Sequence, residues 1–186
     1  MTAAGTRTLS TADERRVALV EAAIPVFAEK GFRAASTIDI SSDAGISQAY
    51  LFRLFPTKVD LFVAVCEAAR ERMLAVFREA ADARGEVPTL EAMGGAYREL
   101  LEADRDVLLI QLQSQVTSGE PKIAAAMQET FRRLHELVAE RADASPEEIR
   151  TWFGQGMLLN VMAAIDATTL DEPWAKALCA SDDPSR

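Results

Sequence analysis

The stretch GISQAYLFRLFPTK, residues 45–58, decides how the rest of this chain is interpreted. It begins like a turn, continues in a short helical pattern and stops at Pro56. Leu51 and Phe55 lie four residues apart, which is the spacing of one buried helix face. Polar residues that a buried helix would not favour surround them: Gln48, Tyr50 and Arg53. The stretch is therefore either a bundle helix with a solvated outer face or a helix that is pressed against another molecule.

The residues before this stretch favour a helix-turn-helix unit. Short helices are expected at 37–43 and 48–55, on either side of the turn Ala44–Ser47. Gly45 can take the positive φ that ends the first helix, and Ser47 can cap the second. In such a unit the second helix meets base edges in the DNA major groove. From the spacing alone, a plain helical hairpin with a polar face stays open as the alternative.

Residues from about 12 to 66 resemble the DNA-binding domain of the TetR family of transcriptional regulators. The residues that carry the resemblance, in order and with the family's spacing, are Glu21-Ala22-Ala23, Phe27-Ala28-Glu29-Lys30-Gly31-Phe32, Ser36-Thr37, Ile40, Ala44-Gly45-Ile46-Ser47, Leu51-Phe52, Phe55, Lys58 and Leu61-Phe62. The resemblance implies a helix-turn-helix head followed by a variable helical domain that binds an effector and dimerises. It leaves the identity of the effector and of the operator open.

The resemblance also implies a set of DNA contacts, carried over position by position. They fall on Thr37, Ser47, Gln48, Ala49, Tyr50, Phe52, Arg53 and Lys58. Glutamine can bond adenine through two groups, arginine can bond guanine, and a lysine at a helix start suits a phosphate. Two positions depart from the family: Phe52 stands where Tyr is frequent and has no hydroxyl for a phosphate, and Leu54 stands where His is common. Leu54 can face either the core or a thymine methyl.

The whole chain is expected to be all-α. Its 186 residues are 49% hydrophobic and 26% charged, which is typical of a folded protein. Helical patterns and their caps predict helices at 12–30, 37–43, 48–55, 58–81, 89–103, 106–117, 121–142, 146–168 and 172–179. We expect a flexible N-terminus (1–11), a three-helix DNA-binding domain (12–72), an effector-binding and dimerisation domain (73–180) and a frayed tail (181–186). The long helix from Lys58 joins the two domains.

Charge is unevenly distributed along the chain. The formal net charge is -9, which argues against binding nucleic acid by bulk electrostatics. Residues 1–60 carry seven basic and seven acidic side chains, whereas the remainder carries thirteen basic and twenty-two acidic ones. All the excess acid therefore follows the helix-turn-helix stretch. The neutral head keeps a second interpretation open, that of a helical small-molecule carrier or protein adaptor that has lost DNA recognition.

No catalytic residues, metal site or cofactor are predicted. His135 opens a fragment that resembles a zinc-protease motif, but Ala139 stands where the second histidine is needed. Cys66 and Cys179 lack metal or disulfide spacing, and the sequence does not decide whether either has a redox role. An apolar membrane span and a signal-peptide pattern are also missing from the sequence, so we expect a cytoplasmic protein that is not an enzyme and has no membrane partner.

The C-terminal half offers candidate effector contacts. They are polar or aromatic side chains within otherwise apolar helices: Gln111, Gln115, Trp152, Met157 and Asn160. Solvated glutamines and ordinary core residues are the alternative explanation. The last long helix mixes large and small residues, which suits packing against a symmetry mate: Trp152, Gly156, Met157, Val161, Ala164 and Ile165. By resemblance the final two helices would form a four-helix dimer interface. Together these features predict a homodimeric, ligand-released regulator of a near-palindromic DNA operator, with repression as the expected sign.

Overall fold

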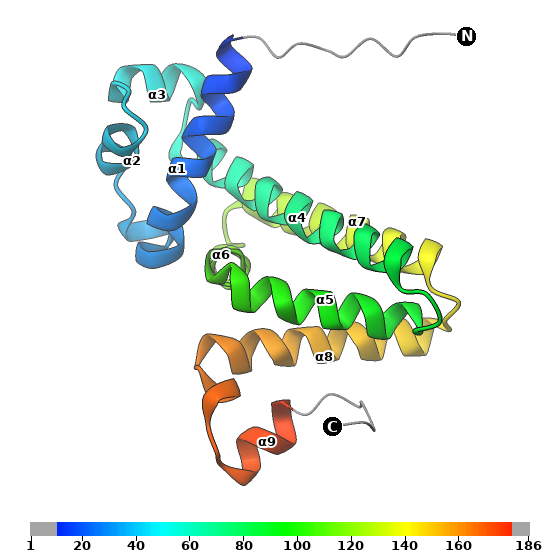
Figure 1. The fold of residues 1–186 in the computed structure, drawn as a ribbon. Helices are drawn as coiled ribbons and strands as arrows, with labels where there is room; N and C mark the ends of the chain where they lie inside the picture. The colour runs from blue at the N-terminus through cyan, green and yellow to red at the C-terminus, as the bar shows by residue number, and fades with distance from the viewer. Residues whose placement is uncertain (1–10, 180–186) are drawn as a thin grey trace, which may run out of the picture.

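The computed structural model describes residues 11–179, and within them the chain forms helices and no strand. The expected all-α fold is confirmed (Figure 1). The predicted flexible N-terminus and frayed tail lie outside the described residues, except for residue 11, where the first helix begins. The elements are α1 (Thr11–Ala34), α2 (Thr37–Asp43), α3 (Gln48–Leu54), α4 (Lys58–Ala83), α5 (Thr89–Ala103), α6 (Arg105–Val116), α7 (Pro121–Arg141), α8 (Pro146–Ala164), the 3-10 turn η1 (Ala167–Thr169) and α9 (Pro173–Cys179).

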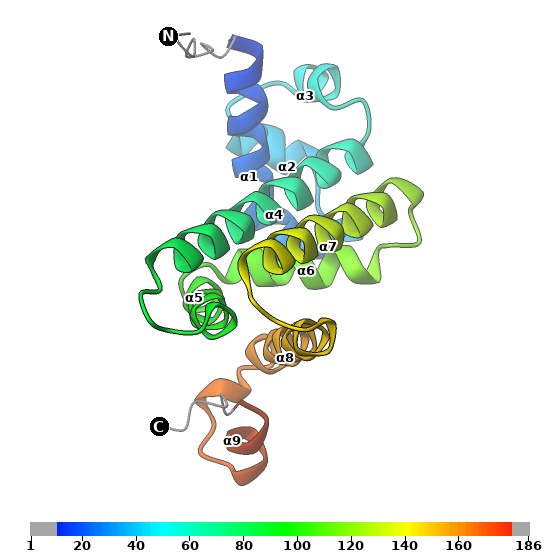
Figure 2. The same cartoon turned by 90° about the vertical axis from the view of Figure 1, so that its right-hand side faces the viewer.

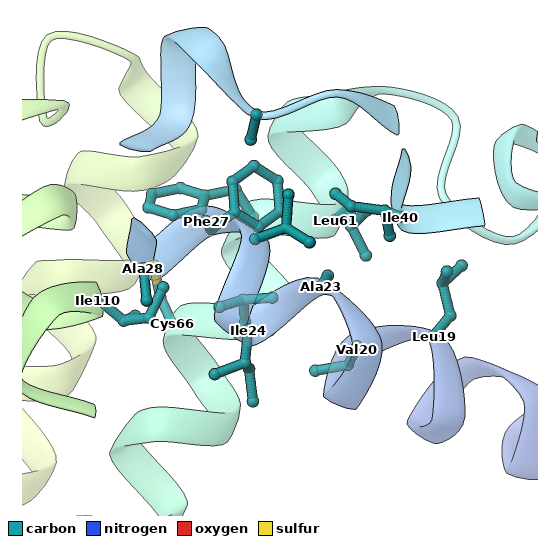
Figure 3. Close-up of a cluster of buried hydrophobic side chains, with 14 of the residues drawn as sticks. Leu19, Val20, Ala23, Ile24, Phe27, Ala28, Ile40, Leu61, Cys66 and Ile110 are labelled. Carbon is teal, nitrogen blue, oxygen red and sulfur yellow. The ribbon is translucent and has the colours of Figure 1, made fainter. Parts of the chain in front are cut away.

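The first three helices form a compact head around the start of α4. Phe27 of α1 and Phe62 of α4 meet edge to face, with ring centroids 4.9 Å apart. Ile40 from α2 and Leu51 from α3 are fully buried in the same cluster, which Figure 3 shows in part. Burying side chains of this size stabilises the head by about 1.5–3 kcal/mol each. The head is therefore held by its own apolar core.

Helix α1 agrees with the sequence pattern at Gly31 and departs from it near its N-terminus. The expected break at Gly31 is confirmed, because its backbone angles (φ 71, ψ 167) lie outside the helical range. Pro25 also lies inside α1, but only Gly31 leaves helical geometry. Val17 shares one helix face with Val20 and Ile24 by its spacing in the sequence, which predicts burial, but it is 55% exposed. The reason is that the N-terminal turns of α1 extend past the head's core (Figure 1).

The remaining helices form layers that extend away from the head. Helices α4 and α7 run side by side, α5 packs against α4, and α8 lies on the far side of α5 (Figures 1 and 2). A second buried cluster fills these layers and begins on α4 at Met73, whereas the head's cluster on α4 ends at Ala69. The predicted domain division between residues 72 and 73 falls in this gap, and it stays a prediction.

Capping side chains stabilise the starts of several helices. Complete capping boxes start α4 at Thr57 with Asp60 and α8 at Ser145 with Glu148. The prediction that α8 continues to residue 168 is wrong. It ends at Ala164, since Asp166 takes a left-handed conformation (φ 55) and a separate 3-10 turn follows. Arg105 donates hydrogen bonds to the carbonyl oxygens of Ala163 and Ala164, which stabilises this early end.

Helix α6 contacts the head and the layers behind it. Its Ile110 is buried in the head's cluster, close to Ala28 and Cys66 in Figure 3. Its Val107 and Leu108 belong to the second cluster. Gln113 faces Gly31 so closely that a Cβ on Gly31 would lie 2.9 Å from Gln113 Oε1. Glycine at position 31 therefore leaves room for the Gln113 amide against α1.

We predict that Gly31→Ala lowers the free energy of unfolding by about 1–3 kcal/mol, because it combines a strained φ with a clash against Gln113. Urea unfolding measures this loss. Gly45→Ala is the matched control: its φ is also positive (64), but a Cβ there would meet nothing within 4 Å. Adding Gln113→Ala should restore part of the stability lost in Gly31→Ala. Equal losses in both Gly31 variants, with and without Gln113, would show that the contact is unimportant.

Candidate DNA-reading helix and ligand cavity

Helix α3 is anchored on one side and exposed on the other. Leu51 and Phe55 are buried in the head's core, as the sequence predicts. Ser47 caps the helix by accepting a hydrogen bond from the backbone N–H of Tyr50 at 3.2 Å. Gly45 takes the expected positive φ of 64° at the turn. The helix thus lies at the outer end of the head, away from the other layers (Figure 1).

The outer face of α3 carries the side chains that were predicted to read DNA. Gln48, Ala49 and Arg53 are exposed, and Tyr50 is half-buried. Gln48 Nε2 donates a hydrogen bond to Thr37 Oγ1 at 3.0 Å, which joins α3 to α2. The Arg53 guanidinium lies 5.4 Å from the centre of the Tyr50 ring. The predicted residues therefore lie together on one surface, with two contacts that orient their polar ends.

Three neighbouring residues do not belong to this exposed polar face. Phe52 is 40% exposed and stays on the surface. Leu54 packs against the head's core, which settles the two orientations that the sequence left open. Lys58 Nζ donates to the carbonyl oxygen of Arg33 at 3.1 Å and lies over the Phe32 ring, and burial lowers its pKa. Its ammonium is therefore held against the head in the structure.

A cavity of about 790 Å³ opens between α4, α5, α6, α7 and α8, with the end of α9 beside it. All five residues predicted to contact an effector line it: Gln111, Gln115, Trp152, Met157 and Asn160. Trp152 is fixed by a 2.8 Å hydrogen bond from its indole N–H to the carbonyl oxygen of Leu90. The size lies within the range of small-molecule sites. The structure brings the five residues together, and their role in binding stays a prediction.

Tyr97 of α5 is a lining residue that the sequence analysis missed. Its hydroxyl lies 3.0 Å from Gln111 Oε1 and 2.7 Å from Asn160 Oδ1, so it joins three helices inside the protein. Burial raises the pKa of this hydroxyl, which therefore stays protonated at neutral pH. No sequence signal distinguishes Tyr97, since its spacing in α5 is that of an ordinary core residue. The polar partners explain why Asn160 can be only 2% exposed.

Two other residues that the sequence analysis considered for chemistry, His135 and Cys66, do not line the cavity. His135 is exposed on α7, near the Phe153 ring, in agreement with a surface histidine. Cys66 is buried in the head's core, and burial raises the pKa of its thiol to about 12. None of the helices within residues 11–179 combines the length and the apolarity that crossing a bilayer requires.

These features define a helix-turn-helix protein with a helical, cavity-bearing C-terminal part, and comparison with known proteins shows which proteins it is similar to. The family described as "Bacterial regulatory proteins, tetR family" matches residues 19–65. The chain is 30% identical over 117 residues to the HTH-type transcriptional activator FasR of Mycolicibacterium smegmatis, covering 61% of this chain and 52% of FasR. It is 26% identical over 122 residues to the HTH-type transcriptional repressor KstR2 of Mycobacterium tuberculosis, covering 63% of this chain and 60% of KstR2. The aligned part thus spans little more than half of each relative.

Solved structures agree with this fold over nearly the whole chain. The multidrug binding protein EbrR, in complex with imidazole, has a TM-score of 0.69 at 23% identity and covers 96% of this chain and 95% of its own. GusR of Salmonella enterica has a TM-score of 0.70 at 20% identity, with 92% and 95% covered. At such identities the likeness concerns the fold alone. Residues 19–65 therefore match a domain of the tetR family of bacterial regulatory proteins, and the two curated relatives are both named as transcriptional regulators.

We predict that a thiol reagent at about pH 8 labels Cys179 but not Cys66 in the folded protein, because only the thiolate reacts and Cys66 stays protonated. Counting modified thiols before and after unfolding in urea tests this. The folded pKa of Cys66 lies above the unfolded one, so the unfolded chain loses this proton first. Cys66 should therefore lower the free energy of unfolding as pH rises from about 9 to about 12. Rapid labelling of Cys66 in the native protein would contradict the burial.

Proposed function

We propose that this chain is a ligand-responsive, DNA-binding transcriptional regulator that acts as a homodimer on a near-palindromic operator. The observation that carries the proposal is the outer face of α3, which leaves Gln48 and Arg53 exposed while Leu51 and Phe55 anchor the helix. Two such heads would place residues 48–54 in successive major grooves, about 34–36 Å apart. The match of residues 19–65 to the tetR family supports this use of the head.

The contact between Gln48 and Thr37 supports base reading. An amide that recognises adenine must donate to N7 and accept from the N6 amino group. Gln48 Nε2 carries two hydrogens, and the Thr37 hydroxyl accepts one of them. The second hydrogen and the carbonyl oxygen remain for the base. In this proposal Thr37 orients Gln48, in addition to the phosphate contact that the family resemblance implies for it.

Ligand response is supported by two connections between the head and the cavity. Helix α6 carries Gln111 and Gln115 on the cavity and Gln113 against Gly31 of α1. Arg72 of α4 binds Glu21 of α1 at 2.6 Å and Asp104, the cap of α6, at 2.7 Å. A ligand that moves α6 would therefore change the position of α1. Because such coupling is reciprocal, operator DNA must weaken ligand binding by the same factor.

Dimerisation is supported by an exposed apolar surface on the last elements. We call it the α8–α9 surface, and its residues are Leu158, Val161, Ile165, Leu170, Trp174 and Leu178. Leu158, Val161 and Ile165 recur at helical spacing along α8 and its C-terminal cap, and exposed apolar side chains on one helix face mark an interaction site. Of the helix residues that the sequence analysis assigned to a symmetry mate, Val161 and Ile165 lie on this surface, whereas Trp152 and Met157 line the cavity.

Repression is the sign that we propose. A dimer that occupies two grooves of its operator excludes other proteins from the same DNA, and a ligand that changes the head spacing releases it. The relatives comprise an activator and a repressor, so transcription must be measured directly. The site of action would be the cytoplasm, where bacterial DNA lies. A carrier or adaptor without DNA recognition is the alternative, and it predicts no preferred DNA sequence.

We predict that selection from random duplexes at about 0.15 M salt enriches a near-palindrome, and that the Gln48→Ala/Arg53→Ala double variant loses this enrichment. Each single change should cost about 1–3 kcal/mol of binding free energy, mainly at particular base pairs, because these side chains contact bases. An enriched sequence that survives in the double variant would refute the assignment of α3.

Lys58→Ala is the matched control for this selection. It should weaken binding to all sequences and reduce the salt slope by about one unit, because a phosphate contact carries no sequence information. If no sequence is enriched, the protein should be unfolded, dialysed and refolded before the selection is repeated, which removes a ligand retained from purification. A second failure would favour the carrier or adaptor.

We predict a dimer in sedimentation at micromolar protein, and a monomer for the Val161→Glu/Ile165→Glu double variant. These residues are 46% and 57% exposed, so the change places charges on the α8–α9 surface without disturbing the core. Val116→Glu is the control, since Val116 is 82% exposed but lies at the end of α6. A wild-type monomer, or a dimer that tolerates both glutamates, would rule out this interface.

A further inference from the structure

We propose that the cavity takes a mainly apolar molecule with a hydroxyl or carbonyl group, that the amide of Gln111 holds this group, and that the cavity selects against carboxylates and phosphates. This inference rests on the proposed ligand response and names the chemical class of the ligand. Its grounds are the apolar wall of the cavity, an unpaired amide at its polar end and the charges along its lining.

The wall of the cavity is apolar and rich in aromatic rings. Met73, Phe77 and Leu134 are buried lining residues, and Trp152 packs edge to face against Phe77 at 5.3 Å. Contact with such a wall yields about 25 cal/mol for each Å² of apolar ligand surface removed from water. The body of the ligand must therefore be apolar.

At the polar end of the cavity, one polar atom of the Gln111 amide has no hydrogen-bond partner within the described part of the protein. The Tyr97 hydroxyl lies within hydrogen-bonding distance of Gln111 Oε1 and Asn160 Oδ1, but it has a single proton to donate. Either Gln111 or Asn160 must therefore present its NH₂ group, in place of its oxygen, to the Tyr97 hydroxyl. In both cases the other polar atom of the Gln111 amide has no partner, because the site occupied by Nε2 is buried and has no hydrogen bond.

An unpaired polar atom at this place costs about 1–3 kcal/mol, which a ligand can recover. A ligand hydroxyl can donate or accept, so it satisfies Gln111 in either amide orientation. A carbonyl oxygen satisfies it when the NH₂ group faces the ligand. The Gln111 amide thus gives the ligand a defined polar end, next to the Tyr97–Asn160 hydrogen bond.

The charges along the lining disfavour an anion. The charged lining residues are Glu91, Arg98, Glu99, Glu102, Glu147 and Glu148. Arg98 is the one cation among the described lining residues, against five glutamates. A hydrogen bond from Ser145 lowers the pKa of Glu148, which therefore stays ionised at neutral pH. These glutamates are exposed, so they repel an approaching carboxylate only weakly, and the larger cost is that its charge would have to leave water.

The test uses three probes with the same ten-carbon chain: 1-decanol, decanoate and decyltrimethylammonium, each below its micelle concentration. Binding to the full chain is followed by calorimetry and by the fluorescence of Trp152, with Trp174→Phe removing the other indole. Decanol should bind at least about tenfold more tightly than decanoate, because only decanoate must bring a charge out of water and past the glutamates of the lining. Gln111→Leu should weaken decanol binding by about tenfold, the worth of one hydrogen bond, while leaving decyltrimethylammonium affinity nearly unchanged.

Gln128→Leu is the matched control, since Gln128 is exposed on α7 and does not line the cavity. If Gln111→Leu fails to fold by circular dichroism, Tyr97→Phe removes only the hydroxyl that orders the two amides and should also weaken decanol binding. Decanoate binding as tightly as decanol, or decanol affinity unchanged in both variants, overturns the inference. So does the absence of binding by all three probes. DNA selection depends on the head, so it reports on the proposed function separately.

Discussion

The close contact between α6 and α1 is the constraint on which the rest of the structure depends. Gly31 leaves helical geometry and has no side chain, so Gln113 can approach its Cα directly. The same approach buries Ile110 of α6 in the head's core. A larger residue at position 31 would be strained at this φ and would displace the Gln113 amide from its place against α1. The head and the layers behind it therefore share one helix, in place of a flexible linker.

This shared helix gives the proposed ligand response a physical basis. Gln111 and Gln115 lie on the cavity side of α6, and Gln113 lies on the head side, only two residues away. Packed interiors are dense, so a small rotation of α6 at the cavity is transmitted to α1 and cannot be absorbed locally. Arg72 adds a charged link, since it binds both Glu21 of α1 and Asp104 at the start of α6. A plain carrier would have no need for either link.

The distribution of charge fits the same division of roles. The head is neutral overall, and two of its cations lie at or near the proposed DNA surface. Arg53 lies on the exposed face of α3, and Lys58 at the start of α4 is hydrogen-bonded to the carbonyl oxygen of Arg33. The excess acid lies in the part of the chain that forms the cavity. In the proposed function, this acid would repel DNA phosphates from all but the head and so limit non-specific binding. It would also oppose the entry of anionic ligands into the cavity.

The sequence by itself determined the helices, the helix-turn-helix unit and the residues of its outer face. These follow from local rules: a serine or threonine satisfies the free N–H groups at a helix start, and a glycine provides positive φ at a turn. Only the tertiary structure decided which glutamine of QLQSQ faces the head, that Tyr97 joins Gln111 to Asn160, and that α8 ends at Ala164. It also left Val17 exposed despite its periodic place. Contacts of this kind depend on how helices distant in sequence rotate and pack against each other, and no local pattern specifies that.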